Sequence, residues 1–115
     1  MSKNYPQIRG DMRKTLGRMV RHLPEVMKSV GTLHDAAYSD GAMTTKQKEL
    51  IALGIGICTR CEDCIAFHTY EALAHGATFE EIIECIGVAI QMGGGPAVMY
   101  AAHALEALEQ FTEDK

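Results

Sequence analysis

The choice between an all-α fold and a mixed fold depends on one stretch, Thr44-Thr45-Lys46-Gln47-Lys48-Glu49-Leu50-Ile51-Ala52-Leu53-Gly54-Ile55-Gly56-Ile57. Its last residues alternate large and small side chains, a pattern that also suits a strand. Its first residues resemble a capping box, because Gln47 follows Thr44 by three positions, and this predicts a helix over residues 45–57. The apolar run continues that helix without a break, and the chain offers no second strand to pair with it. Gly54 and Gly56, which each cost a helix about 1 kcal/mol relative to alanine, then indicate close packing of another backbone.

Two helices are predicted before this stretch. Apolar residues recur at helical spacing from Ile8 to about His22, with basic residues between them, which is typical of an amphipathic helix. Pro24 suits the first turn of a second helix, which Asp40-Gly41 would end. We expect one stripe of this second helix to face inward, formed by Val26, Val30, Leu33, His34 and Ala37.

Three helices are predicted after the stretch, over residues 61–75, 79–92 and 96–111. Gly76 stands at the C-cap position of the first of them. Thr78, with Glu81 three positions later, forms a capping box that opens the second. Gly93-Gly94-Gly95-Pro96 ends the second helix, and its proline opens the third. No convincing strand is left, so the predicted fold class is all-α with about six helices.

Length and composition indicate a single domain, residues 1–115. A chain of 115 residues with 47% hydrophobic content can bury one core but not two. A net charge of -4 argues against nucleic acid as a partner, because that would favour a clustered basic surface. The longest wholly apolar stretch, residues 50–58, is too short to cross a bilayer, so no membrane span is expected. The N-terminal segment lacks the apolar region of a secretory signal, which predicts a cytoplasmic protein.

Two of the predicted helices carry more apolar surface than one subunit can cover. The helix over residues 79–92 is apolar on nearly every side, and the helix over residues 45–57 is similar. Burial of these surfaces against another copy of the chain is the simplest solution. We therefore expect a homo-oligomer.

Three of the four cysteines fall at positions 58, 61 and 64. In a reducing compartment this spacing favours catalytic or metal-binding use over a structural disulfide framework. On a helix that turns about 100° per residue, Cys61, Cys64 and His68 fall within an arc of roughly 60°, so two thiols and an imidazole share one face. The first turn of a helix stabilises a thiolate. One thiol can then resolve a sulfenic acid formed on the other, while His68 takes or supplies a proton.

Glu49 completes the predicted site. Its helical neighbours Ala52, Leu53 and Gly56 are small or apolar, so its carboxylate is expected to point inward. An unpaired charge there would be costly, and pairing with His68 would remove that cost. The candidate catalytic residues are Cys64, Cys61, His68 and Glu49.

The array of Glu49, eleven residues, Cys61-x-x-Cys64, three residues and His68 resembles the active-site signature of the alkylhydroperoxidase D and carboxymuconolactone decarboxylase superfamily. The stretch 71–78, followed by an Ile-rich helix and Gly-Gly-Pro, is similar too. The resemblance covers the chain from about residue 49 onward, and its motif fixes four reactive residues at set spacings.

The resemblance implies an alkylhydroperoxidase D-like helical oligomer with no bound cofactor. It implies small hydroperoxides as substrates and a dithiol donor such as a lipoylated protein. Cys64 would be the cysteine that reacts with peroxide, Cys61 its more exposed resolving partner, and His68 with Glu49 a proton relay. One position departs from the pattern, because the peroxidase-named branch usually has a histidine where this chain has Asp63. With Glu62 beside it, Asp63 adds negative charge that disfavours a nearby thiolate.

Other functions fit parts of the pattern. Cys58, Cys61 and Cys64 with His68 imitate the cysteine run of iron–sulfur ferredoxins, or a zinc-binding module. A carboxymuconolactone decarboxylase-like enzyme shares the family name, although that branch generally lacks the cysteine pair. A purely structural oligomer is a further alternative. Packing or surface positions without catalytic work are expected for Cys85, His22, His34, His75 and His103.

Overall fold

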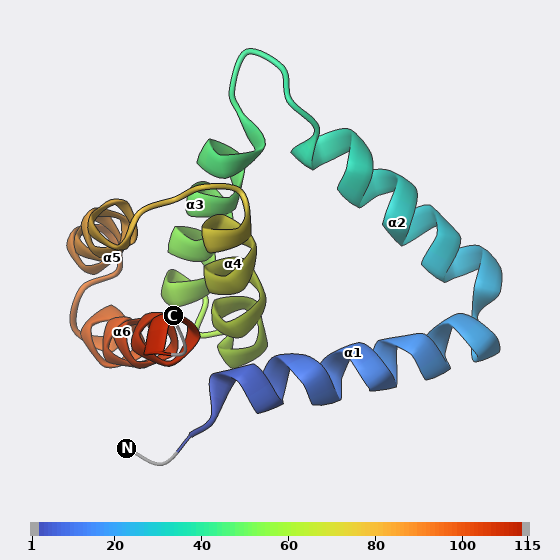
Figure 1. The fold of residues 1–115 in the computed structure, drawn as a ribbon, viewed down its shortest axis with the longest axis horizontal. Helices are drawn as coiled ribbons and strands as arrows, with labels where there is room; N and C mark the ends of the chain where they lie inside the picture. The colour runs from blue at the N-terminus through green and yellow to red at the C-terminus, as the bar shows by residue number, and fades with distance from the viewer. Residues whose placement is uncertain (1–2, 114–115) are drawn as a thin grey trace.

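The computed structural model describes residues 3–113, which form six helices and no strand (Figure 1). The helices are α1 (Tyr5–His22), α2 (Pro24–Tyr38), α3 (Thr45–Cys58), α4 (Glu62–Ala74), α5 (Phe79–Gly93) and α6 (Gly95–Glu113). The predicted all-α class is therefore confirmed. α1 begins at Tyr5 rather than Ile8, because the Asn4 side chain accepts a hydrogen bond from the Gln7 N–H and caps the helix.

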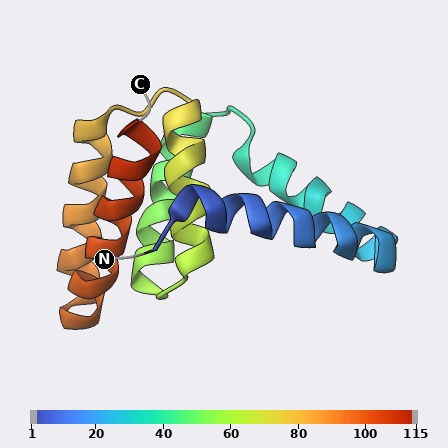
Figure 2. The same cartoon turned by 60° about the horizontal axis from the view of Figure 1, so that its bottom comes forward.

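Helices α3 to α6 form a bundle that contains most of the core. α3 packs against α4 and α5, and α6 packs against the same two helices (Figure 2). The large, fully buried apolar side chains of the bundle are Leu53, Ile57, Ile65, Ile82 and Leu108. α6 contributes buried alanines, which let neighbouring helices approach closely: Ala97, Ala101, Ala104 and Ala107. No helix within residues 3–113 is long and apolar enough to cross a membrane.

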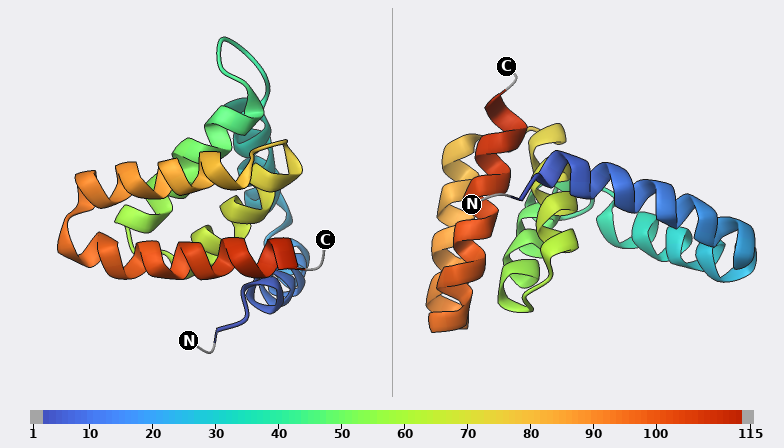
Figure 3. Two further views of the ribbon diagram at one scale, coloured as in Figure 1. Left: turned by 60° about the vertical axis from the view of Figure 1, so that its left-hand side comes forward. Right: turned by 90° about the horizontal axis from the view of Figure 1, so that it is seen from below.

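α1 and α2 form an arm that projects from the bundle (Figure 3). The start of α1 is held against the bundle by α6, where the Gln110 side chain accepts the Tyr5 N–H and donates to the Lys3 carbonyl, both at 2.7 Å. Tyr5 is fully buried at this base. α2 then leads back to the start of α3, so the arm is attached at both ends.

The predicted inward-facing stripe on the second helix is wrong for the single chain. All five of its residues are exposed, Leu33 by 69% and Val30 by 50%. The reason is that α2 contacts α1 at one end and α3 at the other, so none of the described helices covers its length. We define the apolar arm face as the exposed residues Met19, Val20, Leu23, Val26, Val30 and Leu33.

A second open apolar surface lies between α3 and α5. It is a groove of about 680 Å³. Its exposed apolar side chains, Ile51 and Ile55 from α3 and Val88 and Met92 from α5, lie on the sides of these helices that turn away from the core. We call this surface the α3–α5 groove.

Candidate functional site

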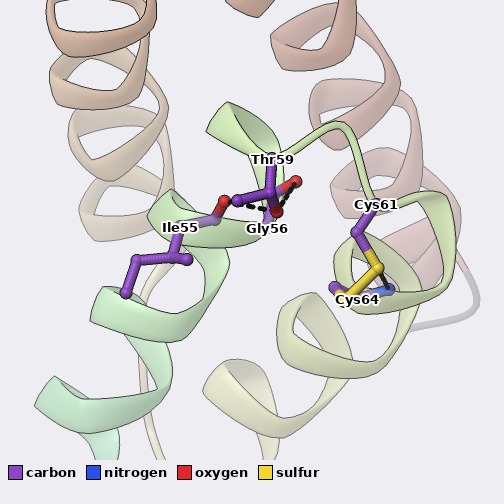
Figure 4. The surroundings of a disulfide bond; sticks show 5 residues. All are labelled: Ile55, Gly56, Thr59, Cys61 and Cys64. Carbon is purple, nitrogen blue, oxygen red and sulfur yellow. Dashed lines mark hydrogen bonds between the residues drawn. A yellow bond between two sulfur atoms is a disulfide. The ribbon is translucent and has the colours of Figure 1, made fainter.

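A tight turn between α3 and α4 positions the two cysteines of the pair. The Cys61 N–H donates to the Gly56 carbonyl at 2.9 Å, and the Arg60 N–H donates to the Ile57 carbonyl at 3.2 Å, which is the hydrogen-bond pattern of a Schellman motif. Arg60 adopts the left-handed conformation, with φ of 59°, that glycine usually occupies there. Thr59 adds a side-chain hydrogen bond to the Ile55 carbonyl (Figure 4). The turn therefore places Cys61 directly beyond the end of α3.

Gly56 allows α3 to approach the start of α4. A Cβ atom at this position would lie 3.0 Å from the Cβ of Cys64. At Gly54 the nearest atom would be the Sγ of Cys85, at an ordinary contact distance of 3.8 Å. The close packing expected at the two glycines is therefore confirmed at Gly56, and it occurs against the cysteine pair itself.

Cys61 and Cys64 are joined by a disulfide, with their Cα atoms 5.2 Å apart. Cys61 is the N-cap of α4, and its Sγ accepts a hydrogen bond from the Cys64 N–H at 3.2 Å (Figure 4). Unsatisfied N–H groups and the positive end of the helix dipole stabilise negative charge at this position. The same contact would therefore stabilise a thiolate on Cys61 once the bridge is reduced.

Glu49 and His68 form a pair across the α3–α4 interface. The Glu49 carboxylate is only 2% exposed, and its Oε1 lies 2.7 Å from the His68 Nδ1. The expectation that Glu49 points inward and pairs with His68 is confirmed. His68 stands one helical turn after Cys64, which puts the two residues on the same face of α4. Because Nδ1 is bonded to Glu49, the imidazole can exchange protons through Nε2.

Tyr38 also reaches this site, and the sequence analysis missed it. Its ring stacks against the ring of His68, with centroids 6.0 Å apart and an angle of 18° between the planes. Tyr38 lies four positions after His34, so the two share a face of α2, but that spacing alone does not reveal contact with another helix. The sequence therefore offered no signal that links Tyr38 to His68.

The negative charge of the Glu62 carboxylate is compensated by neighbouring side chains from the base of the arm and from α6. Lys3 Nζ lies 2.7 Å from its Oε2, and the Tyr5 hydroxyl donates to it at 3.3 Å. His103, expected to be without catalytic work, has its Nδ1 3.6 Å from the Glu62 Oε1. The hydrogen bond to Glu62 raises the pKa of Lys3, and burial followed by the Glu62 charge raises the pKa of Tyr5.

The two remaining cysteines point away from the pair, toward the α3–α5 interface. Cys58 Sγ donates to the Ala89 carbonyl at 3.4 Å, and Cys85 Sγ donates to the Leu50 carbonyl at 3.1 Å. Burial raises the pKa of the Cys85 thiol. Within residues 3–113, no three His, Cys, Asp or Glu side chains are grouped so that they could hold a metal ion. This arrangement lends no support to an iron–sulfur or zinc module built on the cysteine run.

Proteins similar to this chain match it over most of its length. An uncharacterised protein of Cupriavidus necator is 38% identical over 95 residues, which is 83% of this chain and 84% of that protein. A crystal structure of a carboxymuconolactone decarboxylase family protein from Legionella pneumophila is 41% identical, with a TM-score of 0.92 over 96% of this chain and 99% of that one. A Thermotoga maritima member of the same family, with a suggested role in an antioxidative response, is 30% identical, with a TM-score of 0.82 over 96% of this chain and 92% of that one.

The family model for the carboxymuconolactone decarboxylase family matches residues 24–107, which span α2 to α5 and most of α6. That range contains the cysteine pair and the Glu49–His68 pair. Because the match covers most of the chain and the fold agrees with solved members, the chain belongs to the carboxymuconolactone decarboxylase family, which includes alkylhydroperoxidase D-like proteins.

Proposed function

We propose that this protein is a thiol–disulfide oxidoreductase of the alkylhydroperoxidase type, which reduces small hydroperoxides through Cys61 and Cys64. One observation carries the proposal: His68, which is hydrogen-bonded to the buried Glu49 of α3, stands on α4 one helical turn after Cys64 of the disulfide. A redox-active pair beside an oriented base is the arrangement that thiol peroxidase chemistry needs. The antioxidative role suggested for the Thermotoga maritima relative is of the same kind.

In the proposed oxidative half-reaction, Cys64 passes its proton to His68 and attacks the outer oxygen of the hydroperoxide as a thiolate. The O–O bond breaks, and the departing alkoxide takes a proton from His68 and leaves as an alcohol. Cys64 is then a sulfenic acid. The thiol of Cys61 attacks that sulfur, the S–O bond breaks, and water leaves, which yields the disulfide present in the structure. The two thiols have then given two electrons to the peroxide.

In the proposed reductive half-reaction, a dithiol donor of the lipoyl type returns the pair to thiols. One donor thiolate attacks a sulfur of the disulfide, and the second donor thiol resolves the mixed disulfide, so the donor leaves as its own cyclic disulfide. The Cys64 N–H supports the proposal, since it would stabilise a thiolate released at Cys61. A reducing compartment suits this cycle, and we place the protein in the cytoplasm.

Thiol mass, measured before and after oxidation, tests the substrate class and the donor together. Treatment of the reduced protein with a small organic hydroperoxide should remove about two mass units from the peptide that holds Cys61 and Cys64. Dihydrolipoamide should restore them. A bridge on Cys58 or Cys85 would make the assignment of roles wrong. An unchanged mass with free thiols would refute the peroxidase function and favour the decarboxylase-like alternative.

Single cysteine variants separate the two roles. Cys61→Ser should leave Cys64 able to form a sulfenic acid that a dimedone-type reagent traps, whereas Cys64→Ser should abolish peroxide consumption. Cys85→Ser serves as the control and should keep wild-type activity, because its thiol faces the Leu50 carbonyl on the other side of α3. The reverse pattern for Cys61 and Cys64 would exchange their roles.

A further inference from the structure

Tyr38 is the residue of α2 that reaches the Glu49–His68 pair. One face of its ring stacks on His68, with centroids 6.0 Å apart and planes 18° from parallel. The ring also stacks on His34, with centroids 4.6 Å apart and planes at 27°. Apart from Met27, every other residue of α2 is exposed, whereas Tyr38 is partly buried. α2 therefore contributes one aromatic ring to the surroundings of the Glu49–His68 pair.

The backbone around Tyr38 is fastened to the start of α3. The Thr45 hydroxyl donates to the Tyr38 carbonyl at 2.7 Å, and the Lys48 ammonium donates to the carbonyl of Ser39. The Thr45 N–H also donates to the Asp40 carboxylate at 2.7 Å. Because Glu49 follows one turn later on α3, these bonds hold the ring of Tyr38 at a set position relative to the carboxylate that orients His68.

Burial, followed by the Glu49 charge, raises the pKa of the Tyr38 phenol. The phenol is therefore neutral at neutral pH, and its contact with the imidazole is a stacking and shielding contact rather than an ion pair. Within residues 3–113, the titratable groups in contact with His68 are Glu49 from α3 and Tyr38 from α2, and helical spacing puts Cys64 and Glu71 one turn away along α4.

We propose that Tyr38 is a positioning residue of the thiol site: its ring restricts rotation of the His68 imidazole and excludes water from the Glu49–His68 bond. Rotation of the imidazole about its Cβ–Cγ bond would break the 2.7 Å contact between Nδ1 and Glu49. A neighbouring ring limits that rotation, and exclusion of water strengthens the contact. The proposal rests on the proposed function, in which Nε2 of His68 serves Cys64.

Three variants test the role of the ring. Tyr38→Ala removes it and should slow peroxide-dependent formation of the disulfide about tenfold or more, since small displacements of a catalytic group are costly. Tyr38→Phe keeps the ring and should stay within about twofold of wild type, because stacking does not need the hydroxyl. Tyr38→Leu keeps much of the volume without the ring and should resemble Tyr38→Ala, which covers the case in which the alanine variant does not fold.

His34→Ala is the matched control, because it removes a ring that stacks on Tyr38 rather than on His68. It should stay near wild type. A wild-type rate in both Tyr38→Ala and Tyr38→Leu would overturn the proposal. A loss in Tyr38→Phe as large as in Tyr38→Ala would overturn it too, because the hydroxyl and not the ring would then matter.

Two readouts do not depend on peroxide turnover. The pH at which reduced Cys64 reaches half of its maximal reactivity toward iodoacetamide should differ between wild type and Tyr38→Ala. In Tyr38→Phe this pH should equal the wild-type value. The ¹⁵N shift of the His68 Nδ1 should show a weakened hydrogen bond in Tyr38→Ala alone. If wild type consumes no hydroperoxide, the proposed function fails, and these two measurements still decide the role of Tyr38: no change in either would overturn it.

Discussion

Glu49 and His68 each meet a physical requirement of the other. The carboxylate is nearly inaccessible and needs a hydrogen-bond donor, and the imidazole needs a fixed tautomer to act on a thiol. Their 2.7 Å contact meets both needs. The pair spans two helices, so any change that separates α3 from α4 at this level would affect the chemistry and the packing together.

Loss of either member of the pair is predicted to slow turnover. His68→Gln removes the base, and Glu49→Gln removes the charge that orients and stabilises it. Because general acid–base help is typically worth about 10²–10⁴-fold in rate, each variant should turn over a suitable hydroperoxide about 10²-fold more slowly or worse. Stopped-flow or coupled assays measure the rate, and circular dichroism should show the fold unchanged.

Glu109→Gln, which changes an exposed carboxylate on α6, is the control and should keep wild-type rates. The relay is refuted if His68→Gln and Glu49→Gln also keep wild-type rates while Cys64→Ser is inactive. Cys64 would then rely on the helix terminus alone for its reactivity.

Cys85 is predicted to react with alkylating reagents more slowly than the cysteine pair. Burial raises the pKa of its thiol, so its reactive thiolate fraction at neutral pH is below that of an ordinary cysteine and grows only as the pH rises. In reduced protein, mass spectrometry after a short exposure to iodoacetamide should find label on Cys61 and Cys64 before Cys85. Labelling of Cys85 first at neutral pH would contradict the burial argument.

At the scale of elements, the contact between α3 and α4 can be tested with two glycines of one helix. Gly54→Ala should stabilise the protein by about 0.5–1 kcal/mol, because alanine favours the helix and its Cβ would meet only an ordinary contact. Gly56→Ala should destabilise it by about 1–3 kcal/mol, because its Cβ would lie 3.0 Å from the Cβ of Cys64. Equilibrium unfolding in urea measures both. Equal effects of the two substitutions would contradict this prediction, because they would show that α3 and α4 can shift enough to accommodate a Cβ atom at position 56.

Local signals predicted most of the elements. The capping boxes at Thr44 and Thr78 are both present, and Gly76 ends α4 with a positive φ of 94°. The predicted start of the first helix, Ile8, lies three residues after the observed start, Tyr5. Asn4, two positions before Pro6, is a typical N-cap signal that the apolar periodicity alone does not include. The exposure of α2 was not predictable, since periodicity identifies an apolar stripe but not whether another helix covers it.

The part of the candidate site that could be predicted from the sequence is the part that rests on local chemistry. Glu49 sits among small apolar neighbours, and a buried carboxylate needs a partner, so its pairing with His68 followed from the sequence. The compensation of Glu62 by Lys3 and the stacking of Tyr38 did not follow. Both join residues far apart in the chain and depend on how helices cross, which no short motif encodes.

At the scale of the whole molecule, the chain is predicted to form a homo-oligomer. The apolar arm face and the α3–α5 groove both stay uncovered in the single chain. Such large apolar surfaces are typical of interfaces. Analytical ultracentrifugation at micromolar concentration should show a species larger than 12.6 kDa. A well-folded monomer would contradict the burial argument.

Surface variants can show which face is used. Leu33→Asp on the apolar arm face and Val88→Asp in the α3–α5 groove should each shift the assembly toward smaller species, because a carboxylate is costly to bury. Lys28→Ala, on the opposite side of α2, is the control and should leave the assembly unchanged. If neither aspartate has an effect, the two surfaces are not where copies of the chain meet.

The disulfide bridges residues only three positions apart in the chain. A covalent link stabilises a fold chiefly by limiting the freedom of the unfolded chain, and a loop this short limits it little. Opening the bridge should therefore lower the melting temperature by less than the loss of a bridge between distant residues would. The molecule can then gain and lose electrons repeatedly while it keeps its fold.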